Sequence, residues 1–571
     1  MKQCPDCNRI YEDETLNYCL DDGTSLRQLP TDEAATAVLP AAGVSAEGPT
    51  KLYRGAAKLS SHPREKPAPS TAAGPDRAAG KRLYVRIGLI LFIIAAAFMA
   101  FRFVPSSGGD KQIKSIAVMP FANESGSADL EYLTDGMTES LITSLSQLPN
   151  LNVKARSSVF RYKGREIEPR TAAGELSVEA LLLGRVVQQG DSVALHIELV
   201  DPKTENALWR ADYNRPVANL ASLQNELARD VATRLKARLS GAEEQRLGKR
   251  QTDDPETYKL YLMGRYQLNR LTDDGFRKAA DHFLNAIARD PNYAPAFAGL
   301  AETYNRLSGW NAIAPRDGFP KAREAAVKAL ELDPTLAEAR TTLGAVKHYY
   351  DWDPRGAENE FKRAIVLDPN SAEARSMYGY FLSAVGRFDE AMSQMRIAQE
   401  LDPLSIEKIA GVGEVLYLER RYDEAVEQYR KALELDPNSG FAHWAIGRAM
   451  IEKGSYDDAI ATLRKAIAFS GDSPDEIVEL GRAYARAGRR AEALKVIDDL
   501  RQLATRRYVS PASIGSIYAG MGEKDQAFVW FERALEERDF LLVLFKVDPL
   551  FDGVRSDARF SDLVKRAGLA V

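Results

Sequence analysis

Three cysteines and one aspartate near the N-terminus have the spacing best suited to chemistry. Cys4, Cys7 and Cys19 are all the cysteines of the chain, and Asp22 follows shortly after the last of them. Two cysteines separated by two residues on a tight turn can hold one Zn²⁺ ion, and such sites take four tetrahedral ligands. The sequence predicts a zinc site of Cys4, Cys7 and Cys19 with Asp22 as the fourth ligand. The alternatives are Asp21 in that place, a site of three ligands, or a tail that binds no metal.

The first 27 residues are too few to bury an apolar core, so a bound metal ion is the expected source of their fold. The stretch CPDCNRIYEDETLNYCLDDGTSL resembles the small zinc-ribbon-like heads that precede some bacterial membrane-bound kinases and repeat proteins. It departs from four-cysteine coordination at Asp22. We therefore expect a zinc-ribbon-like head over residues 1–27, with Zn²⁺ as a structural cofactor.

The rest of the sequence carries no motif of a known catalytic site. It lacks G-x-S-x-G, H-E-x-x-H and the kinase H-R-D, and its five histidines are scattered. A net charge of −5, 45% hydrophobic and 27% charged residues are ordinary for a globular protein. A pI near 5.8 argues against a chain that binds nucleic acid generally. With 571 residues, we expect a non-enzymatic protein of about three to five domains.

A linker and one membrane crossing are predicted after the head. Residues 28–82 are rich in small residues and proline, which is typical of a disordered linker. Residues 83–104, LYVRIGLILFIIAAAFMAFRFV, are long enough for one transmembrane helix, with a buried core helix as the alternative. Nine basic residues lie between Lys51 and Arg86, opposed by Glu65 and Asp76. The charge asymmetry predicts a single-pass protein of the bacterial inner membrane, with a cytoplasmic N-terminus and periplasmic C-terminal domains.

Residues 112–240 alternate between strand and helix patterns, in the order strand, helix, strand, three-stranded meander and helix. This order predicts an α/β domain with one sheet covered by helices on one face. The blocks IAVMPFANESG, EYLTDGMTESLITSLSQLPNLNVKARSSVFRYKG, LLLGRVVQQGDSVALHIELVD and ALWRADYNRP resemble the TolB-like amino-terminal domain. That domain often precedes tetratricopeptide (TPR) repeats in bacterial signalling proteins. The resemblance implies an interaction or sensing module and transfers no catalytic residue.

A small residue recurs through the remaining sequence, and the last five of its steps are 34 residues long. The series is Ala279, Ala322, Ala357, Ala391, Ala425, Ala459, Ala493 and Ala527. Small residues let the two helices of a hairpin cross closely. The pattern resembles TPR repeats and predicts an all-α superhelix of about eight repeats over residues 255–540. Residues 541–571 resemble the ending of TolB-like repeat proteins and are expected to cap this superhelix.

The first helices of stacked TPR hairpins line a concave groove. Family geometry directs five aromatic or arginine side chains toward it, and these are the candidate partner contacts: Tyr380, Tyr417, Trp444, Arg448 and Arg482. Aromatic and arginine side chains are frequent anchors of protein interfaces. The alternative is that they pack between repeats or face solvent.

The leading hypothesis is a non-enzymatic, membrane-anchored scaffold or envelope signalling protein that binds a protein or peptide through the TPR groove. A second hypothesis is a membrane-bound transcription regulator whose N-terminal head contacts DNA. The head has three basic and six acidic residues between Lys2 and Arg27, which suits a phosphate backbone poorly. A third is an enzyme with an unrecognised site in the TolB-like domain. No small-molecule substrate is evident from the sequence.

Overall fold

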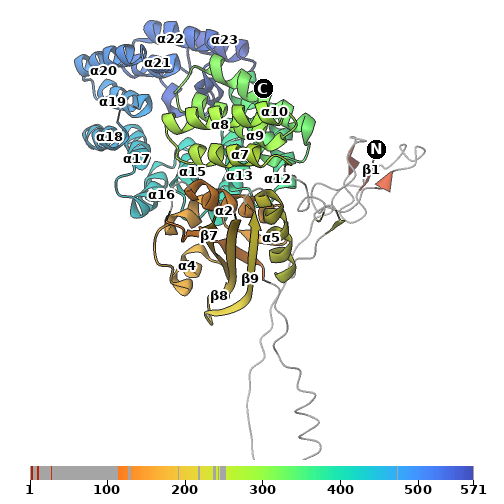
Figure 1. Cartoon of the computed structure of the whole chain (residues 1–571). Coiled ribbons are helices and arrows are strands. Elements are labelled where there is room, and N and C mark those ends of the chain that lie inside the picture. The colour runs from red at the N-terminus through yellow and green to blue at the C-terminus, as the bar shows by residue number, and fades with distance from the viewer. Residues whose placement is uncertain are drawn as a thin grey trace, which may run out of the picture. The chain divides into compact units, whose positions relative to one another are not determined.

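An α/β sheet and a long series of paired helices make up most of the described chain (Figure 1). The computed structural model describes residues 2–3, 10–11, 27–28, 113–126, 130–190, 192–216, 219–235, 240–241, 244, 252–471 and 473–569. The chain divides into two units, Met1–Pro105 and Ser106–Val571. In the first unit, three two-residue strands pair antiparallel in the order β2-β1-β3. They are β1 (Lys2–Gln3), β2 (Ile10–Tyr11) and β3 (Arg27–Gln28).

The predicted fold class and localisation need correction at the membrane helix. Within the described ranges, no helix combines the length and the apolar character that a bilayer crossing requires. The predicted span, residues 83–104, lies outside those ranges, as do the predicted linker and the predicted zinc ligands Cys4, Cys7, Cys19 and Asp22. The prediction of a single transmembrane helix is therefore not upheld. The inner-membrane location and the periplasmic C-terminal domains, which depended on that helix, are not upheld either.

The second unit begins with a six-stranded sheet in the order β6-β4-β7-β8-β9, with β5 pairing beside β7. The strands are β4 (Ser115–Val118), β5 (Ala122–Asn123), β6 (Asn152–Val153), β7 (Ala180–Gln189), β8 (Ser192–Asp201) and β9 (Asn206–Pro216). The helices are α2 (Glu131–Ser146), α3 (Arg156–Val159), α4 (Pro169–Leu176) and α5 (Leu220–Arg234). In β8, alternate residues such as Val193, Leu195 and Ile197 are buried, because successive side chains of a strand point to opposite faces.

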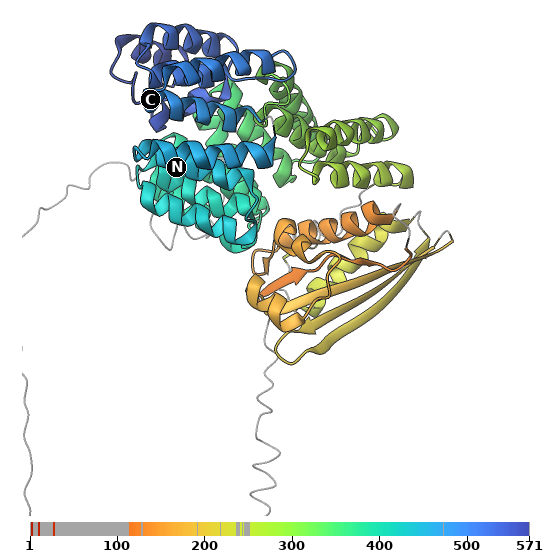
Figure 2. The same cartoon turned by 90° about the vertical axis from the view of Figure 1, so that its left-hand side faces the viewer.

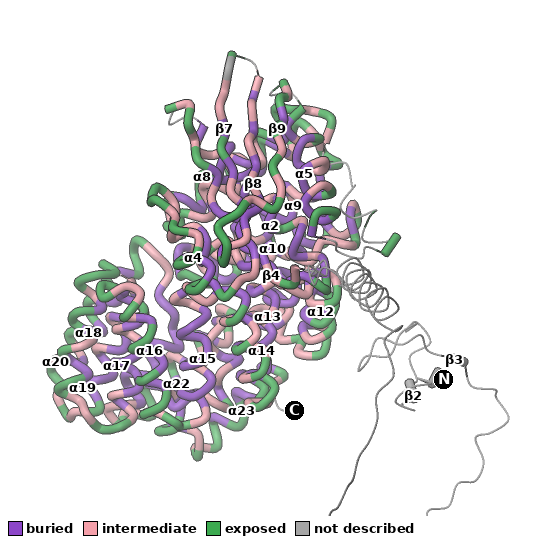
Figure 3. Tube along the Cα trace, turned by 90° about the horizontal axis from the view of Figure 1, so that it is seen from below, coloured by how far each residue is buried: buried purple, intermediate pink, exposed green. Residues whose placement is uncertain are grey.

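Eight pairs of antiparallel helices follow within the described residues. The pairs are α7 (Pro255–Leu268) with α8 (Asp273–Arg289), α9 (Ala294–Gly309) with α10 (Pro315–Leu332), α11 (Ala337–Val346) with α12 (Pro354–Leu367), α13 (Ala372–Ala384) with α14 (Phe388–Leu401), α15 (Ile406–Leu418) with α16 (Tyr422–Leu435), α17 (Gly440–Glu452) with α18 (Tyr456–Ser470), α19 (Pro474–Arg486) with α20 (Arg490–Leu503), and α21 (Pro511–Gly520) with α22 (Lys524–Glu536). A π-helical turn, η4 (Lys347–Asp351), extends α11. Figure 3 shows α15 buried along most of its length, whereas α18 and α20 expose much of their surface.

Close helix crossings explain the recurring small residues. A Cβ atom on Gly447 would lie 2.5 Å from the Cγ atom of Leu463 on the paired helix. Ala425 and Ala459, two members of the predicted series, are fully buried. Such contacts require a small side chain at the crossing point. The TPR prediction is thereby confirmed in the helices as well as in the spacing.

The helix stack curls far enough for its early and late repeats to touch. The side-chain amide of Asn311, which follows α9, donates to the carboxylate of Asp475 on α19 at 3.2 Å. The guanidinium of Arg507, after α20, donates to the backbone carbonyl of Trp310 at 3.2 Å. These contacts join residues 164 and 197 positions apart and bring the second repeat against the seventh.

The α/β domain shares its core with the first repeat. Figure 2 shows α2 lying between the sheet and the first repeat helices. A Cβ atom on Gly136 of α2 would lie 2.7 Å from the Cδ2 atom of Leu262 on α7, and Tyr258 and Leu262 belong to the α/β core.

The α/β domain also forms hydrogen bonds with the turns between later repeats. The hydroxyl of Ser158 donates to Asp402 at 2.6 Å, and that of Ser146 donates to Asp368 at 2.8 Å.

The C-terminal segment returns into the concave side. It consists of η5 (Phe540–Leu544), η6 (Pro549–Phe551) and α23 (Ala558–Arg566). Phe545 packs against Phe531 of α22 and against Phe551 and Phe560 of its own segment, with ring centroids 4.5–5.9 Å apart. This aromatic cluster anchors the segment, and other residues of the segment form part of the wall of the concave side.

Candidate ligand-binding cavity of the superhelix

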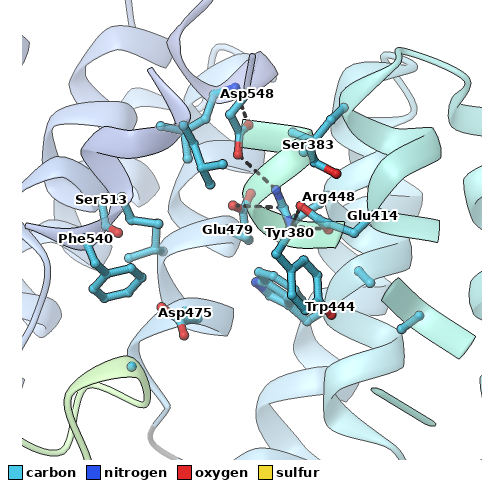
Figure 4. A pocket seen from close by; sticks show the side chains of 18 of the residues that line it. Tyr380, Ser383, Glu414, Trp444, Arg448, Asp475, Glu479, Ser513, Phe540 and Asp548 are labelled. Atoms are coloured by element: carbon cyan, nitrogen blue, oxygen red, sulfur yellow. Dashed lines mark hydrogen bonds and ion pairs between the residues drawn. The ribbon is translucent and has the colours of Figure 1, made fainter. Parts of the chain in front are cut away.

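A cavity of about 270 Å³ lies between the concave faces of the repeats and the C-terminal segment (Figure 4). Its volume is below the range of roughly 300–1,000 Å³ that is usual for drug-sized ligands. The wall carries aromatic and charged side chains from η4, α13, α15, α17, α19 and the C-terminal segment, among them His348, Tyr380, Glu414, Phe441, Trp444, Arg448, Asp475, Glu479, Phe540 and Asp548. The space fits a single side chain or a small molecule.

Arg448 stands at the centre of the charged wall and is 5% exposed. Its guanidinium lies 3.1 Å from Glu414, 3.2 Å from Asp548 and 3.7 Å from Glu479. Burial by itself lowers the pKa of Arg448, but these carboxylates outweigh burial and keep its pKa above the ordinary value. The arginine therefore stays charged and ties α15, α19 and the C-terminal segment together.

Asp475 differs from the other carboxylates of the cavity. Its carboxylate accepts hydrogen bonds from the amide of Asn311, and among the described residues no cationic side chain forms an ion pair with it. Burial raises the pKa of Asp475 to about 7, with Glu476 and Glu479 raising it further and the more distant Arg507 and Arg448 opposing them. A carboxyl group with this pKa exchanges its proton near neutral pH.

The aromatic part of the wall leaves polar atoms without partners. The Nε1 atom of Trp444 and the Nε2 atom of His348 are buried, and neither has a hydrogen-bond partner in the part of the chain that the structure describes. His348 is 5% exposed, and burial lowers its pKa to about 3, so its ring is neutral. Phe441 stacks on Trp444 at 5.5 Å and is 41% exposed, which places an accessible ring at the rim of the cavity.

The five predicted contact residues divide into two groups. Tyr380, Trp444 and Arg448 line the cavity. Tyr417 and Arg482 lie behind its wall. The ring of Tyr417 is fully buried 4.3 Å from the guanidinium of Arg448, and Arg482 is 3% exposed and pairs with Glu479 and with a second carboxylate on α17. These two residues hold the wall in place and are not accessible to a partner.

Sequence reasoning missed the acidic members of the site, although one signal was available for Glu414. Glu414 precedes Arg448 by 34 residues, so it occupies the same position one repeat earlier. Side chains at equivalent positions of neighbouring repeats lie side by side along the concave face. Asp548 and His348 gave no such signal, because the first lies beyond the repeats and the second in an irregular turn.

A second cavity of about 460 Å³ lies where the α/β domain meets the repeats, but its cations already have partners. Arg156 lies 3.2 Å from Glu139, while Arg306 and Lys408 lie 3.0 Å and 2.5 Å from Glu373. Because these cations are already paired, we interpret the second cavity as part of the interface between the α/β domain and the repeats. Across the described ranges, no group of histidine, cysteine, aspartate or glutamate side chains is arranged to hold a metal ion.

Family comparisons match both parts of the second unit. Residues 111–230 match the HilA/YgeH-like transcriptional regulator, second domain. Tetratricopeptide repeat models match residues 360–392, 416–475, 451–509 and 512–539. The family found for the α/β region thus differs in name from the predicted TolB-like domain.

Two curated relatives illustrate the similarity. A putative adenylate cyclase 3 of Rhizobium meliloti is 32% identical over 234 residues, which cover 40% of this chain and 39% of the relative. The transcriptional regulator HilA of Salmonella typhimurium is 24% identical over 279 residues, which cover 49% of each. The chain therefore spans half or less of the length of these relatives.

Solved repeat proteins are similar over shorter stretches. The structure of Pseudomonas aeruginosa PilF is 23% identical, covers 36% of this chain and 91% of its own, and has a TM-score of 0.28. That of yeast Tom70 is 18% identical, covers 54% and 67%, and has a TM-score of 0.36. Taken with the family matches, the helix pairs establish that the C-terminal part of this chain is a tetratricopeptide repeat superhelix.

Proposed function

We propose that this chain is a non-enzymatic interaction scaffold that binds a protein or peptide partner at the cavity of its TPR superhelix. The observation that carries the proposal is the preformed opening in the concave side, with the accessible ring of Phe441 at its rim. Aromatic side chains in desolvated pockets are typical centres of binding energy in protein interfaces. Because the C-terminal segment fills part of the concave side, the partner inserts a short element and does not lie along the whole superhelix.

Affinity capture with the full chain tests this proposal. Proteins from the source organism are captured on immobilised wild type, on Phe441→Asp and on Val529→Asp. Val529 is a matched control because it is 63% exposed on α22 and does not line the cavity. We expect a partner that Val529→Asp retains and Phe441→Asp loses. Capture that is equally strong on all three proteins would contradict the proposal.

Two finer assignments accompany the scaffold proposal. One is a TolB-like sensing role for the α/β domain, supported by the sequence blocks quoted above. The other is structural Zn²⁺ on Cys4, Cys7, Cys19 and Asp22, supported by the ligand types and spacing. Zinc analysis of the full chain, with Cys19→Ser and Asp22→Ala, tests the second. One bound ion per chain is expected, and both substitutions should weaken its retention.

A transcription regulator is the second candidate function, favoured by the HilA/YgeH-like match over residues 111–230 and by the similarity to HilA. A gel-shift assay with the full chain tests it. Regulation through DNA contact requires binding that weakens as salt concentration rises. DNA binding that is absent at low salt would remove this candidate.

The similarity to a putative adenylate cyclase makes cyclic AMP formation the enzymatic activity to test. The TPR fold is typical of binding proteins, and the sequence carries none of the catalytic motifs sought in it. The scaffold proposal predicts that the full chain forms no cyclic AMP from ATP with Mg²⁺ or Mn²⁺ present. Cyclic AMP formation that survives deletion of the repeats would instead place an active site outside them.

A further inference from the structure

The charges that line the cavity do not balance. Four carboxylates, Glu414, Asp475, Glu479 and Asp548, share the wall with one guanidinium, that of Arg448. Arg482 lies behind the wall and divides its pairing between Glu479, at 2.5 Å, and Glu452, at 2.7 Å. Within the described residues the cavity therefore has an excess of negative charge, and Asp475 has no cation paired with it. Buried charge is costly unless it is paired, so this excess favours a cation in the cavity.

The uncharged part of the wall also suits a cation. The rings of Tyr380, Trp444 and Phe540 lie around the space (Figure 4), and Phe441 also lines it. Aromatic faces attract ammonium and guanidinium groups. His348 adds an independent observation, because it lines the cavity and its buried Nε2 atom has no hydrogen-bond partner among the described residues. A neutral ring that carries its proton on Nδ1 would offer Nε2 as an acceptor for an N–H group.

We infer that the cavity receives the basic side chain of a partner protein, an arginine or a lysine, with Asp475 as its counter-ion. The inference rests on the proposed scaffold function and names the chemistry of the partner's inserted element. The guanidinium or ammonium group donates to Asp475 and to the Nε2 atom of His348, while its methylene stem packs on Trp444 and Phe540. Glu414, Glu479 and Asp548 keep their pairing with Arg448 and hold the wall.

The binding of peptides to the full chain tests the inference. The probes are acetyl-Ala-Arg-Ala-amide and the same tripeptide with citrulline, which keeps the shape of arginine and lacks its charge. Isothermal titration calorimetry should show at least a tenfold preference for the arginine peptide. Asp475→Asn should abolish this preference, since an asparagine can still accept from Asn311 but carries no charge. Asp458→Asn removes the same charge from an exposed position on α18 and should preserve the preference.

The pH dependence of peptide affinity distinguishes a counter-ion from a structural residue, because a purely structural role of Asp475 would not change it. Its carboxyl must lose a proton to pair with a cation, so affinity for the arginine peptide should rise from pH 6 to pH 8 in wild type. The groups that face Asp475 are Glu476, Glu479, Arg448 and Arg507, and the substitution should flatten the profile. Thermal unfolding of Asp475→Asn and Asp458→Asn verifies that both variants fold.

Three outcomes would overturn the inference. The first is equal affinity for the arginine and citrulline peptides, and the second is an arginine preference that survives Asp475→Asn. The third is binding of agmatine, a free guanidinium compound, without binding of the tripeptide, which would make the ligand a small molecule. Protein capture that depends on Phe441 alongside any of these results would leave the scaffold function standing, whereas capture independent of Phe441 would remove it separately.

Discussion

Arg448 on α17 and Asp548, which lies 100 residues further along the chain, form a buried ion pair at 3.2 Å. The pair joins the middle of the superhelix to the C-terminal segment. The side chain of Asp548 also accepts a hydrogen bond from the backbone N–H of Leu550 and so begins η6. One carboxylate therefore shapes the segment and attaches it to the concave side.

Removing the charge of Asp548 should loosen this attachment. Asp548→Asn keeps a capping side chain but ends the ion pair, and hydrogen bonds to charged groups contribute about 1.5–3 kcal/mol. Because Glu414 and Glu479 still pair with Arg448, we expect a loss of about 1–2 kcal/mol in unfolding free energy. Urea unfolding measures the loss, and hydrogen exchange over residues 540–551 should accelerate.

Asp557→Asn is the matched control for Asp548→Asn. Asp557 likewise caps a helix of the C-terminal segment, but its partner Arg559 is half exposed. Surface ion pairs contribute about 0–1 kcal/mol. Equal destabilisation by the two substitutions would mean that the buried pair does not anchor the segment.

The junction between the α/β domain and the repeats should depend on Asp402. This residue is 1% exposed and accepts hydrogen bonds from the hydroxyls of Ser157 and Ser158. Asp402→Ala leaves both hydroxyls without their acceptor, at a cost of about 1–3 kcal/mol for each group that stays buried. Thermal unfolding should shift downward, and hydrogen exchange should increase in α3.

Asp436→Ala provides the comparison one repeat later. Asp436 ends α16 as Asp402 ends α14, and its side chain accepts a hydrogen bond from the backbone N–H of Asn438 in its own turn. We expect a smaller loss of stability and unchanged exchange in α3. Faster exchange in α3 for both variants would show that the turns after α14 and α16, and not the contact of Asp402 with the α/β domain, determine the exchange rate in α3.

The raised pKa of Asp475 predicts that replacing this residue with asparagine stabilises the fold at high pH. Its folded-state pKa of about 7 exceeds the ordinary value of 3.8, so the folded chain holds this proton more tightly than the unfolded chain does. The associated stability is present below pH 4 and is lost as pH rises toward and through 7. At pH 8, Asp475→Asn should therefore be more stable than wild type by on the order of 2 kcal/mol, since the side chain is only partly buried and solvent screens its charge.

Thermal unfolding of wild type and Asp475→Asn at pH 5 and pH 8 measures this effect. The difference between the two proteins should be larger at pH 8, because wild type then buries a charged carboxylate. A difference that is independent of pH would show that Asp475 has an ordinary pKa.

Close packing between paired helices should make Gly447 sensitive to substitution. Gly447→Ala places a Cβ atom 2.5 Å from Leu463, and overpacking of a core costs about 1–3 kcal/mol. Gly174 on α4 has no atom within 4 Å of the equivalent position, so Gly174→Ala should be neutral or stabilise by about 1 kcal/mol. Urea unfolding of the two variants gives the comparison, and equal effects would contradict the proposed crossing at Gly447.

Some features of the site could be predicted because they repeat along the sequence. The 34-residue spacing of small residues indicated the helix pairs, and the shared position within each repeat directed attention to Tyr380, Trp444 and Arg448. The same spacing would have identified Glu414 as the neighbour of Arg448. Periodicity carries this information because each repeat buries the same face against its neighbours.

Other features follow from contacts between segments far apart in sequence. Tyr417 satisfied the same pattern as Trp444, yet its ring is buried under Arg448. Whether a groove position stays accessible depends on what packs against it, and no local pattern records that. The predicted membrane helix was similarly a local inference, from hydropathy and flanking charge, and the described part of the chain contains no helix that supports it.

The sequence by itself determined that helices pair, that they repeat, and which small residues mark their crossings, since these depend on side-chain size and spacing within one repeat. The tertiary structure alone decided three contacts. Asn311 forms a hydrogen bond with Asp475, Asp402 accepts hydrogen bonds from the α/β domain, and Asp548 pairs with Arg448. Those contacts arise from the curvature of the whole superhelix, which accumulates from small rotations between successive repeats. The result is a small acidic cavity in place of an open groove.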